Sequence, residues 1–236
     1  MSAARSIAHL SPLRLFDQLE GGPLRSGELV LLVAPAGVGK SSCLVQIALR
    51  YLLERQPVVH IVLGQPLPRV LTWYDRGLKE LAEGAAVEIS QIPNLDQLAT
   101  LRHITSYLAK GCTVEMICDG LRQICQGRTI SPKVVIIDGF PIAHASHERV
   151  EVLRDLAAEL GVVMWISALG KGKGLRKEST AGPFGQIAPL FDVLARIRPG
   201  DAFSKLQIIQ SRETALSKPI TMKLNPRTLL RASEEP

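Results

Sequence analysis

Residues 29–42 read Leu29-Val30-Leu31-Leu32-Val33-Ala34-Pro35-Ala36-Gly37-Val38-Gly39-Lys40-Ser41-Ser42. The apolar residues at the start are typical of a strand that is buried on both faces, as in a parallel sheet. A glycine-rich turn follows, and Lys40 then opens the helical pattern of residues 43–49. Strand, loop and helix in this order form the context of a phosphate-binding loop.

This loop predicts a nucleotide site. The amides of such a loop and the helix N-terminus donate to phosphate oxygens, Lys40 reaches the β- and γ-phosphates, and the Ser41 hydroxyl holds Mg²⁺. We therefore expect ATP and Mg²⁺ as cofactors. Ala34 stands where the consensus has its first glycine, and the alternative is a glycine-rich turn that binds nothing. The predicted binding residues are Ala36, Gly37, Val38, Gly39, Lys40, Ser41 and Ser42.

A second motif lies about a hundred residues downstream, where Val134-Val135-Ile136-Ile137 is followed by Asp138. Four β-branched residues before an acid are typical of a Walker B strand, whose aspartate holds the Mg²⁺. A hydrophobic strand that ends in aspartate is common by itself. Together with the upstream loop, the pattern predicts that Ser41 and Asp138 are the metal-binding residues.

Length and composition limit the class of protein. The 236 residues predict one α/β domain, with residues 1–28 as a lead-in and residues 226–236 as a tail. An apolar share of 46% and a charged share of 21% are typical of a globular protein and not of a disordered one. The apolar runs are too short to span a bilayer and no signal-peptide core is present, so we expect a cytoplasmic protein without a membrane partner. Four cysteines without a Cys-x-x-Cys motif predict reduced thiols.

The net charge of +6 favours anionic partners. Nucleic acid, a membrane surface and a nucleotide are all consistent with this charge. Aromatic residues make up only 4% of the chain, which leaves little material for stacking nucleobases. The sequence argument for single-strand binding therefore rests on charge.

Before the first strand, Leu15-Phe16-Asp17-Gln18-Leu19-Glu20-Gly21-Gly22 reads as a short amphipathic helix that is ended by glycines. Together with the phosphate loop and the Walker B strand, this segment resembles the RecA/DnaB/KaiC group of P-loop ATPases, over about residues 12–230. The resemblance implies a RecA-like α/β domain. Such a domain has a mostly parallel twisted sheet flanked by helices, a C-terminal antiparallel hairpin, and nucleotide at the carboxyl edge of the sheet.

Three positions depart from that family, and the first follows the expected strand at 57–63. The family places a glutamate there to activate water, whereas this chain has Gly64 and then Gln65, which can orient water but cannot take a proton. The usual general base is therefore expected to be absent and hydrolysis slow. His60 within the strand is either a core residue or a catalytic one.

The other two departures concern the γ-phosphate. The resemblance implies that Ser167 senses this phosphate at the end of its strand, but the glutamine that usually follows is Ala168. The Lys-x-Arg pair that the family presents to a neighbour's ATP has Gln210 in place of its lysine. It retains Arg212, either as a trans arginine finger or as a surface charge at a strand end. The predicted catalytic residues are Lys40, Asp138, Ser167 and Arg212.

A basic glycine-rich loop follows the strand of Ser167. In the family this loop faces a central channel or filament axis and contacts DNA, whereas the alternative is a solvated loop. The predicted nucleic-acid residues are Lys171, Lys173, Arg176 and Lys177.

Periodicity predicts the other elements. We expect helices over residues 67–83, 95–109, 113–126 and 148–160 and a short strand at 87–89, with closing strands over 191–197, 205–209 and 218–224.

The resemblance implies an ATPase that forms a homo-oligomer and associates with single-stranded DNA, and the missing glutamate predicts that it hydrolyses ATP slowly. Its protein partners would act in recombination, replication or repair. The alternative is a degenerate, KaiC-like ATPase that serves as a nucleotide-dependent regulator or scaffold and binds no DNA. The three substituted positions favour the regulator, and the basic loop favours the DNA-linked ATPase.

Overall fold

A mixed β-sheet runs through the part of the chain that the structure describes. This structure is a computed structural model that describes residues 7–127, 130–142, 145–170, 184–212 and 214–232. The strands within these ranges lie in the order β3-β2-β4-β5-β1-β6-β7-β8. Their bounds are β1 Leu29–Ala34, β2 Val58–Leu63, β3 Arg102–Tyr107, β4 Val134–Asp138, β5 Val163–Leu169, β6 Val193–Arg198, β7 Ser204–Ser211 and β8 Thr214–Leu224.

The strands from β3 to β6 are parallel, and β7 and β8 add an antiparallel hairpin to the β6 side. The predicted α/β class, with a mostly parallel sheet and a C-terminal antiparallel hairpin, is confirmed. β5 lies between β1 and β4, so the strand of Ser167 separates the strand that precedes Lys40 from the strand of Asp138.

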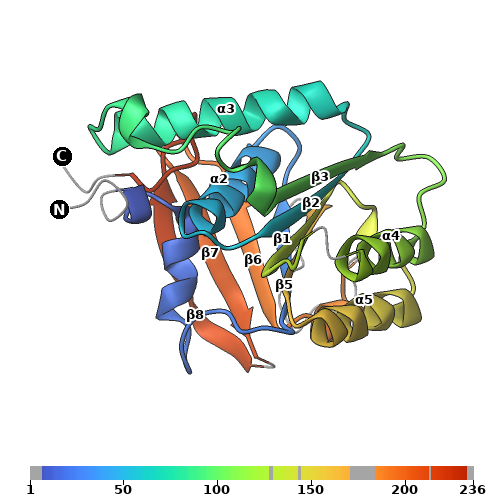
Figure 1. Ribbon diagram of the computed structural model, residues 1–236. Coiled ribbons are helices and arrows are strands. Elements are labelled where there is room, and N and C mark those ends of the chain that lie inside the picture. Colours follow the sequence, from blue (N-terminus) through green and yellow to red (C-terminus); the bar gives the residue numbers. More distant parts are fainter. Residues whose placement is uncertain (1–6, 128–129, 143–144, 171–183, 213, 233–236) are drawn as a thin grey trace.

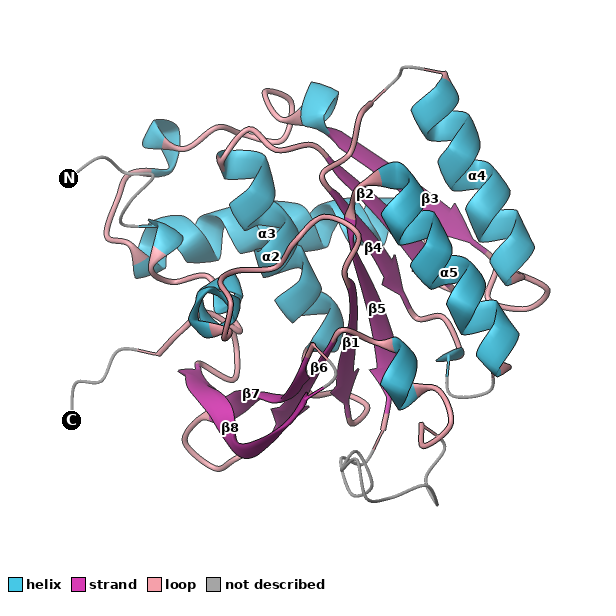
Figure 2. Cartoon of the chain, turned by 90° about the horizontal axis from the view of Figure 1, so that it is seen from below, coloured by secondary structure: helices cyan, strands magenta, loops and turns pink. Residues whose placement is uncertain are grey.

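Helices cover both faces of the parallel strands. The helices α2 (Lys40–Leu53) and α3 (Leu67–Gly84) lie on one face, and α4 (Val114–Gln126) and α5 (His147–Leu160) lie on the other (Figures 1 and 2). Each face packs its own cluster of apolar side chains, which explains why β1 and β2 are buried along their whole length. The helices expected near 67–83, 113–126 and 148–160 are confirmed. No helix in the described ranges is both long and apolar enough to cross a membrane.

Two sequence-based expectations are wrong. The segment expected as a helix over 95–109 contains a short 3₁₀ turn, Ala99–Leu101, and then the edge strand β3. The strand expected at 87–89 is a loop that leads into a 3₁₀ turn, Ile89–Gln91. β3 is only half-buried, so it lacks the apolar run that marks the central strands, and its pairing with β2 decides its conformation.

Candidate functional site

The loop between β1 and α2 has the backbone of a tight turn. Gly37 and Gly39 have φ angles of 78° and 91°, a region that side chains rarely adopt, and α2 begins directly after Gly39. A Cβ atom on Gly39 would lie 2.6 Å from Leu229 Cδ2, because the chain after β8 packs against the loop. A side chain at position 39 would therefore be strained by the backbone and would also require the Leu229 side chain to move.

Lys40 lies at the wall of a cavity. The residue is half-buried, and its ammonium makes no hydrogen bond or ion pair with the residues that the structure describes. An unpartnered cation next to a hollow suits an anionic ligand. The cavity measures about 250 Å³ and is lined by Lys40, Gly139, Phe140, Pro141, Ile142, Ser167, Ala168 and Leu169.

Asp138 is held in place from the neighbouring strand. Its side chain lies at the end of β4 and is only 3% exposed. Ser167 Oγ, which is fully buried on β5, donates to Asp138 Oδ1 over 2.5 Å and accepts from the Gly139 amide over 3.0 Å. These two bonds fix the orientation of the carboxylate next to the cavity of Lys40.

The other predicted binding residues lie along the same turn. Ala36 and Gly37 are exposed at its tip, whereas Val38, Ser41 and Ser42 are half-buried. Within the described ranges no group of three His, Cys, Asp or Glu side chains could hold a metal ion. A cation here would therefore bind through Asp138, Ser41 and oxygens of its ligand. That donor set fits Mg²⁺, which is usually held by one or two carboxylates together with substrate phosphates.

A buried histidine lies on the same face of the sheet as Asp138. His60 Nδ1 is 2.8 Å from the Tyr74 hydroxyl, while Nε2 has no partner in the described structure. Burial lowers the pKa of His60 to about 4, although the nearby Asp138 charge acts to raise it, so the ring is neutral at pH 7. His60 does not line the cavity. The sequence left a core and a catalytic role open for His60, and it did not pair His60 with Tyr74.

Gly64, where the sequence predicts the loss of a general base, has a backbone conformation that favours glycine. Gly64 has a φ of 71°, and its amide donates to the Tyr107 carbonyl over 2.9 Å. A Cβ atom there would lie 3.3 Å from Ala109 Cβ, so glutamate at position 64 would be strained. Moreover, none of the described residues that line the cavity of Lys40 is an aspartate or glutamate.

Arg212 lies at the opposite edge of the sheet from Lys40. It directly follows β7, which ends beside the amino end of β6. Its Nε donates to Glu28 Oε1 over 2.8 Å, and its two Nη atoms donate to backbone carbonyls of Glu20, Gly22 and Pro23. All three guanidinium nitrogens are thus used within the chain, which favours a structural role for Arg212 over the expected trans arginine finger.

The remaining predicted residues divide between the core and the undescribed part of the chain. Gln210, which replaces the lysine of the Lys-x-Arg pair, is buried and donates to the Phe191 carbonyl over 3.0 Å. The predicted nucleic-acid residues Lys171, Lys173, Arg176 and Lys177 lie outside the described residues.

Comparison with known proteins identifies no family for this chain. No protein-family model matches it, and no curated protein matches it as a relative.

Proposed function

We propose that this chain is a RecA-like ATPase that binds ATP and Mg²⁺ at the carboxyl edge of its sheet and hydrolyses ATP slowly. The observation that carries the proposal is the Lys40 ammonium, which has no partner among the described residues and lies beside a cavity whose wall also contains Ser167, the residue that orients Asp138. A free cation, a glycine turn at a helix start and a fixed carboxylate are the groups that triphosphate binding requires.

Each group has a separate task in this proposal. The amides of residues 36–41 and the Lys40 ammonium bind the phosphate oxygens. Ser41 and Asp138 hold Mg²⁺, which supplies positive charge against the phosphates when it is bound. Ser167 keeps the Asp138 carboxylate in one orientation through their hydrogen bond, and its place in the cavity wall supports a role in sensing the terminal phosphate.

Slow hydrolysis follows from what lines the cavity. Water attack is faster when a carboxylate takes the proton, and no described lining residue carries one. The left-handed backbone at Gly64 disfavours a side chain at that position, including the glutamate that the resemblance leads us to expect. We therefore expect turnover well below the enzyme median of about 10 s⁻¹.

The partners we propose are further copies of this chain and single-stranded DNA, with protein partners in recombination, replication or repair. The net charge of +6 supports a polyanionic partner. A second candidate function is a nucleotide-dependent regulator that binds no DNA. It is favoured by Arg212, because a guanidinium that is bonded within its own chain is not available to the ATP of a neighbouring subunit.

The test of nucleotide binding is the thermal stabilisation that ATP and Mg²⁺ produce. A ligand at a hundred times its Kd stabilises the native state by about 2.7 kcal/mol. Lys40→Ala should lose most of this effect and leave the melting temperature without ATP unchanged, because Lys40 has no partner in the described structure. Lys79→Ala, which removes an exposed cation from α3, is the matched control and should respond to ATP like the natural chain.

An ATP response that survives in Lys40→Ala would refute the proposed site. Steady-state hydrolysis with and without single-stranded DNA then separates the two functions. Stimulation by DNA supports the DNA-linked ATPase, and a rate that DNA does not change supports the regulator.

A further inference from the structure

Three cations face one another across the last three strands of the sheet. In the register of β6, β7 and β8, Arg198 pairs with Lys205, and Lys205 pairs with Lys223. All three side chains are exposed, and none forms a salt bridge with a described residue. Like charges in directly opposed pairs destabilise a sheet, so the fold by itself gains nothing from this row.

A second row lies two residues further into the same face. Arg196 Nε donates to Gln207 Oε1 over 3.0 Å, and Gln207 Nε2 donates to Thr221 Oγ1 over 3.1 Å. These residues are also paired across the strands. Arg196 and Gln207 are half-buried, and Thr221 is exposed, so this second row borders the first one on the same face.

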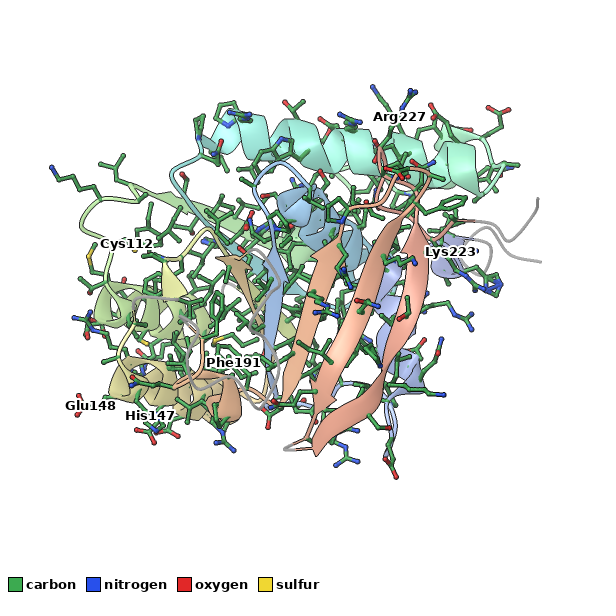
Figure 3. All side chains as sticks on the ribbon, turned by 180° about the vertical axis from the view of Figure 1, so that it is seen from behind. Cys112, His147, Glu148, Phe191, Lys223 and Arg227 are labelled. Atoms are coloured by element: carbon green, nitrogen blue, oxygen red, sulfur yellow. The ribbon has the colours of Figure 1, made fainter. Side chains whose placement is uncertain are left out.

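No described helix covers this face. The alternate residues of the same strands, such as Val193, Ile208 and Met222, point to the other face and pack into the apolar cluster around α2. Figure 3 looks onto the open face, with Lys223 labelled at the end of β8. The two rows, Arg198-Lys205-Lys223 and Arg196-Gln207-Thr221, are called the cationic face below.

An aromatic ring stands at the end of the first row. The Lys223 Nζ is 5.6 Å from the centroid of the Phe203 ring, and Phe203 is 37% exposed. Exposed aromatic rings beside cations are the means by which proteins bind single strands, since the ring stacks on a base while the cations neutralise phosphates.

We propose that the cationic face binds single-stranded DNA, which crosses β6, β7 and β8 along the Arg198-Lys205-Lys223 row. Neighbouring strands lie about 4.8 Å apart, so the row spans roughly 10 Å and can contact two or three successive phosphates. This inference rests on the DNA association proposed above and assigns it to a surface. A membrane is a poorer partner for this face, because none of the side chains in the two rows is apolar.

The position of this face relates it to the nucleotide site. β6 lies beside β1, and Arg198 ends β6 at the same edge of the sheet at which β1 leads to Lys40. DNA on the cationic face would therefore lie next to the strand that carries the phosphate loop.

The test is fluorescence anisotropy of a labelled oligothymidylate of about 20 nucleotides, which is longer than the usual binding site of such a face. The variant combines Arg198→Ala, Lys205→Ala and Lys223→Ala. Each phosphate contact to a single strand contributes about −0.7 to the slope of log K against log salt, so the slope should flatten by roughly 2. At low salt we expect affinity to fall about tenfold or more. The control combines Lys79→Ala, Lys110→Ala and Lys133→Ala, which removes the same charge from exposed positions elsewhere.

The outcomes separate the surface from the function. If the natural chain binds DNA and both triple variants bind it equally well, the cationic face is refuted while the DNA association stands. If both variants lose affinity to the same extent, only net charge matters and the assigned surface is wrong. A natural chain that responds to ATP but binds no oligothymidylate refutes the DNA association and the cationic face together, and leaves nucleotide binding in place. Binding to anionic lipid vesicles without binding to DNA also overturns the proposal.

Discussion

The two edges of the central sheet use charged side chains in opposite ways. At the amino edge, Arg212 is bound to Glu28, and the Asp192 carboxylate accepts from the Leu29 amide over 2.7 Å. At the carboxyl edge, Lys40 and the row that starts at Arg198 have no anionic partner among the described residues.

This difference indicates that the paired charges serve stability and that the unpaired charges serve ligand binding. A charge with a fixed partner holds distant segments together, as Arg212 holds the lead-in near Gly22 against the end of β7. A charge without a partner adds little to the fold and is available to a ligand. Removing a cation should therefore reduce stability at the amino edge and reduce binding at the carboxyl edge.

The largest effect on stability is expected for Arg212→Ala. The substitution leaves the Glu28 carboxylate, whose side chain is only 11% exposed, without its partner and removes the hydrogen bonds to three carbonyls. Loss of one partner of a buried ion pair costs about 3–5 kcal/mol. The loss of stability should lie near the lower end of this range, because Arg212 is partly exposed. Urea denaturation of the variant and the natural chain measures this difference in the free energy of unfolding.

Arg227→Ala is the control, because it removes an exposed arginine from the turn that follows β8 at the carboxyl edge. It should change stability by less than about 0.5 kcal/mol. Equal losses in the two variants would mean that the two edges do not differ.

A second prediction concerns His60, which is fully buried in the middle of β2. Its pKa is near 4 in the folded chain and about 6.5 when unfolded, so the unfolded state binds a proton first as pH falls. The contribution of the neutral ring to stability is complete above pH 6.5 and is lost between about 6.5 and 4. It amounts to roughly 3 kcal/mol in this window.

His60→Gln, which keeps a polar group for Tyr74, should flatten the dependence of stability on pH in that window. His9→Gln, at an exposed histidine, should leave the dependence as in the natural chain. Urea unfolding at several pH values between 4 and 7 measures both. A natural slope in His60→Gln would show that folding does not lower the pKa of His60.

The sequence predicted the parts of the molecule that depend on local pattern. The continuous apolar runs identified β1, β2 and β4, and the glycine turn before Lys40 identified the start of α2. β3 was not predicted, because Arg102 and His103 open a half-buried edge strand whose pairing with β2 is a tertiary feature. The bond from Ser167 to Asp138 depends on β5 lying between β1 and β4.

Contacts between residues that are distant in the sequence could not be predicted from local pattern either. Arg212 and Glu28 are 184 positions apart, and local pattern could not distinguish their ion pair from an arginine that faces a neighbour. The cationic face has the same origin, since Arg198, Lys205 and Lys223 meet only through the register of β6, β7 and β8.

The smallest predicted effect is that of Ser167→Ala, and it tests whether the carboxyl edge is built for a ligand. Alanine removes the bonds to Asp138 and to the Gly139 amide, which should lower the free energy of unfolding by about 1–2 kcal/mol. Ser204→Ala is the control, because Ser204 is also buried but its hydroxyl has no hydrogen bond in the described structure.

Without Ser167 the Asp138 carboxylate is free to turn, so the ATP-induced rise in melting temperature should shrink when Mg²⁺ is present. With the metal chelated, ATP should stabilise the variant and the natural chain equally, because Lys40 and the loop amides are unchanged. A loss of stability with a normal Mg²⁺-dependent response to ATP would mean that Ser167 serves the fold alone, and the carboxyl edge would then differ from the amino edge only at Lys40.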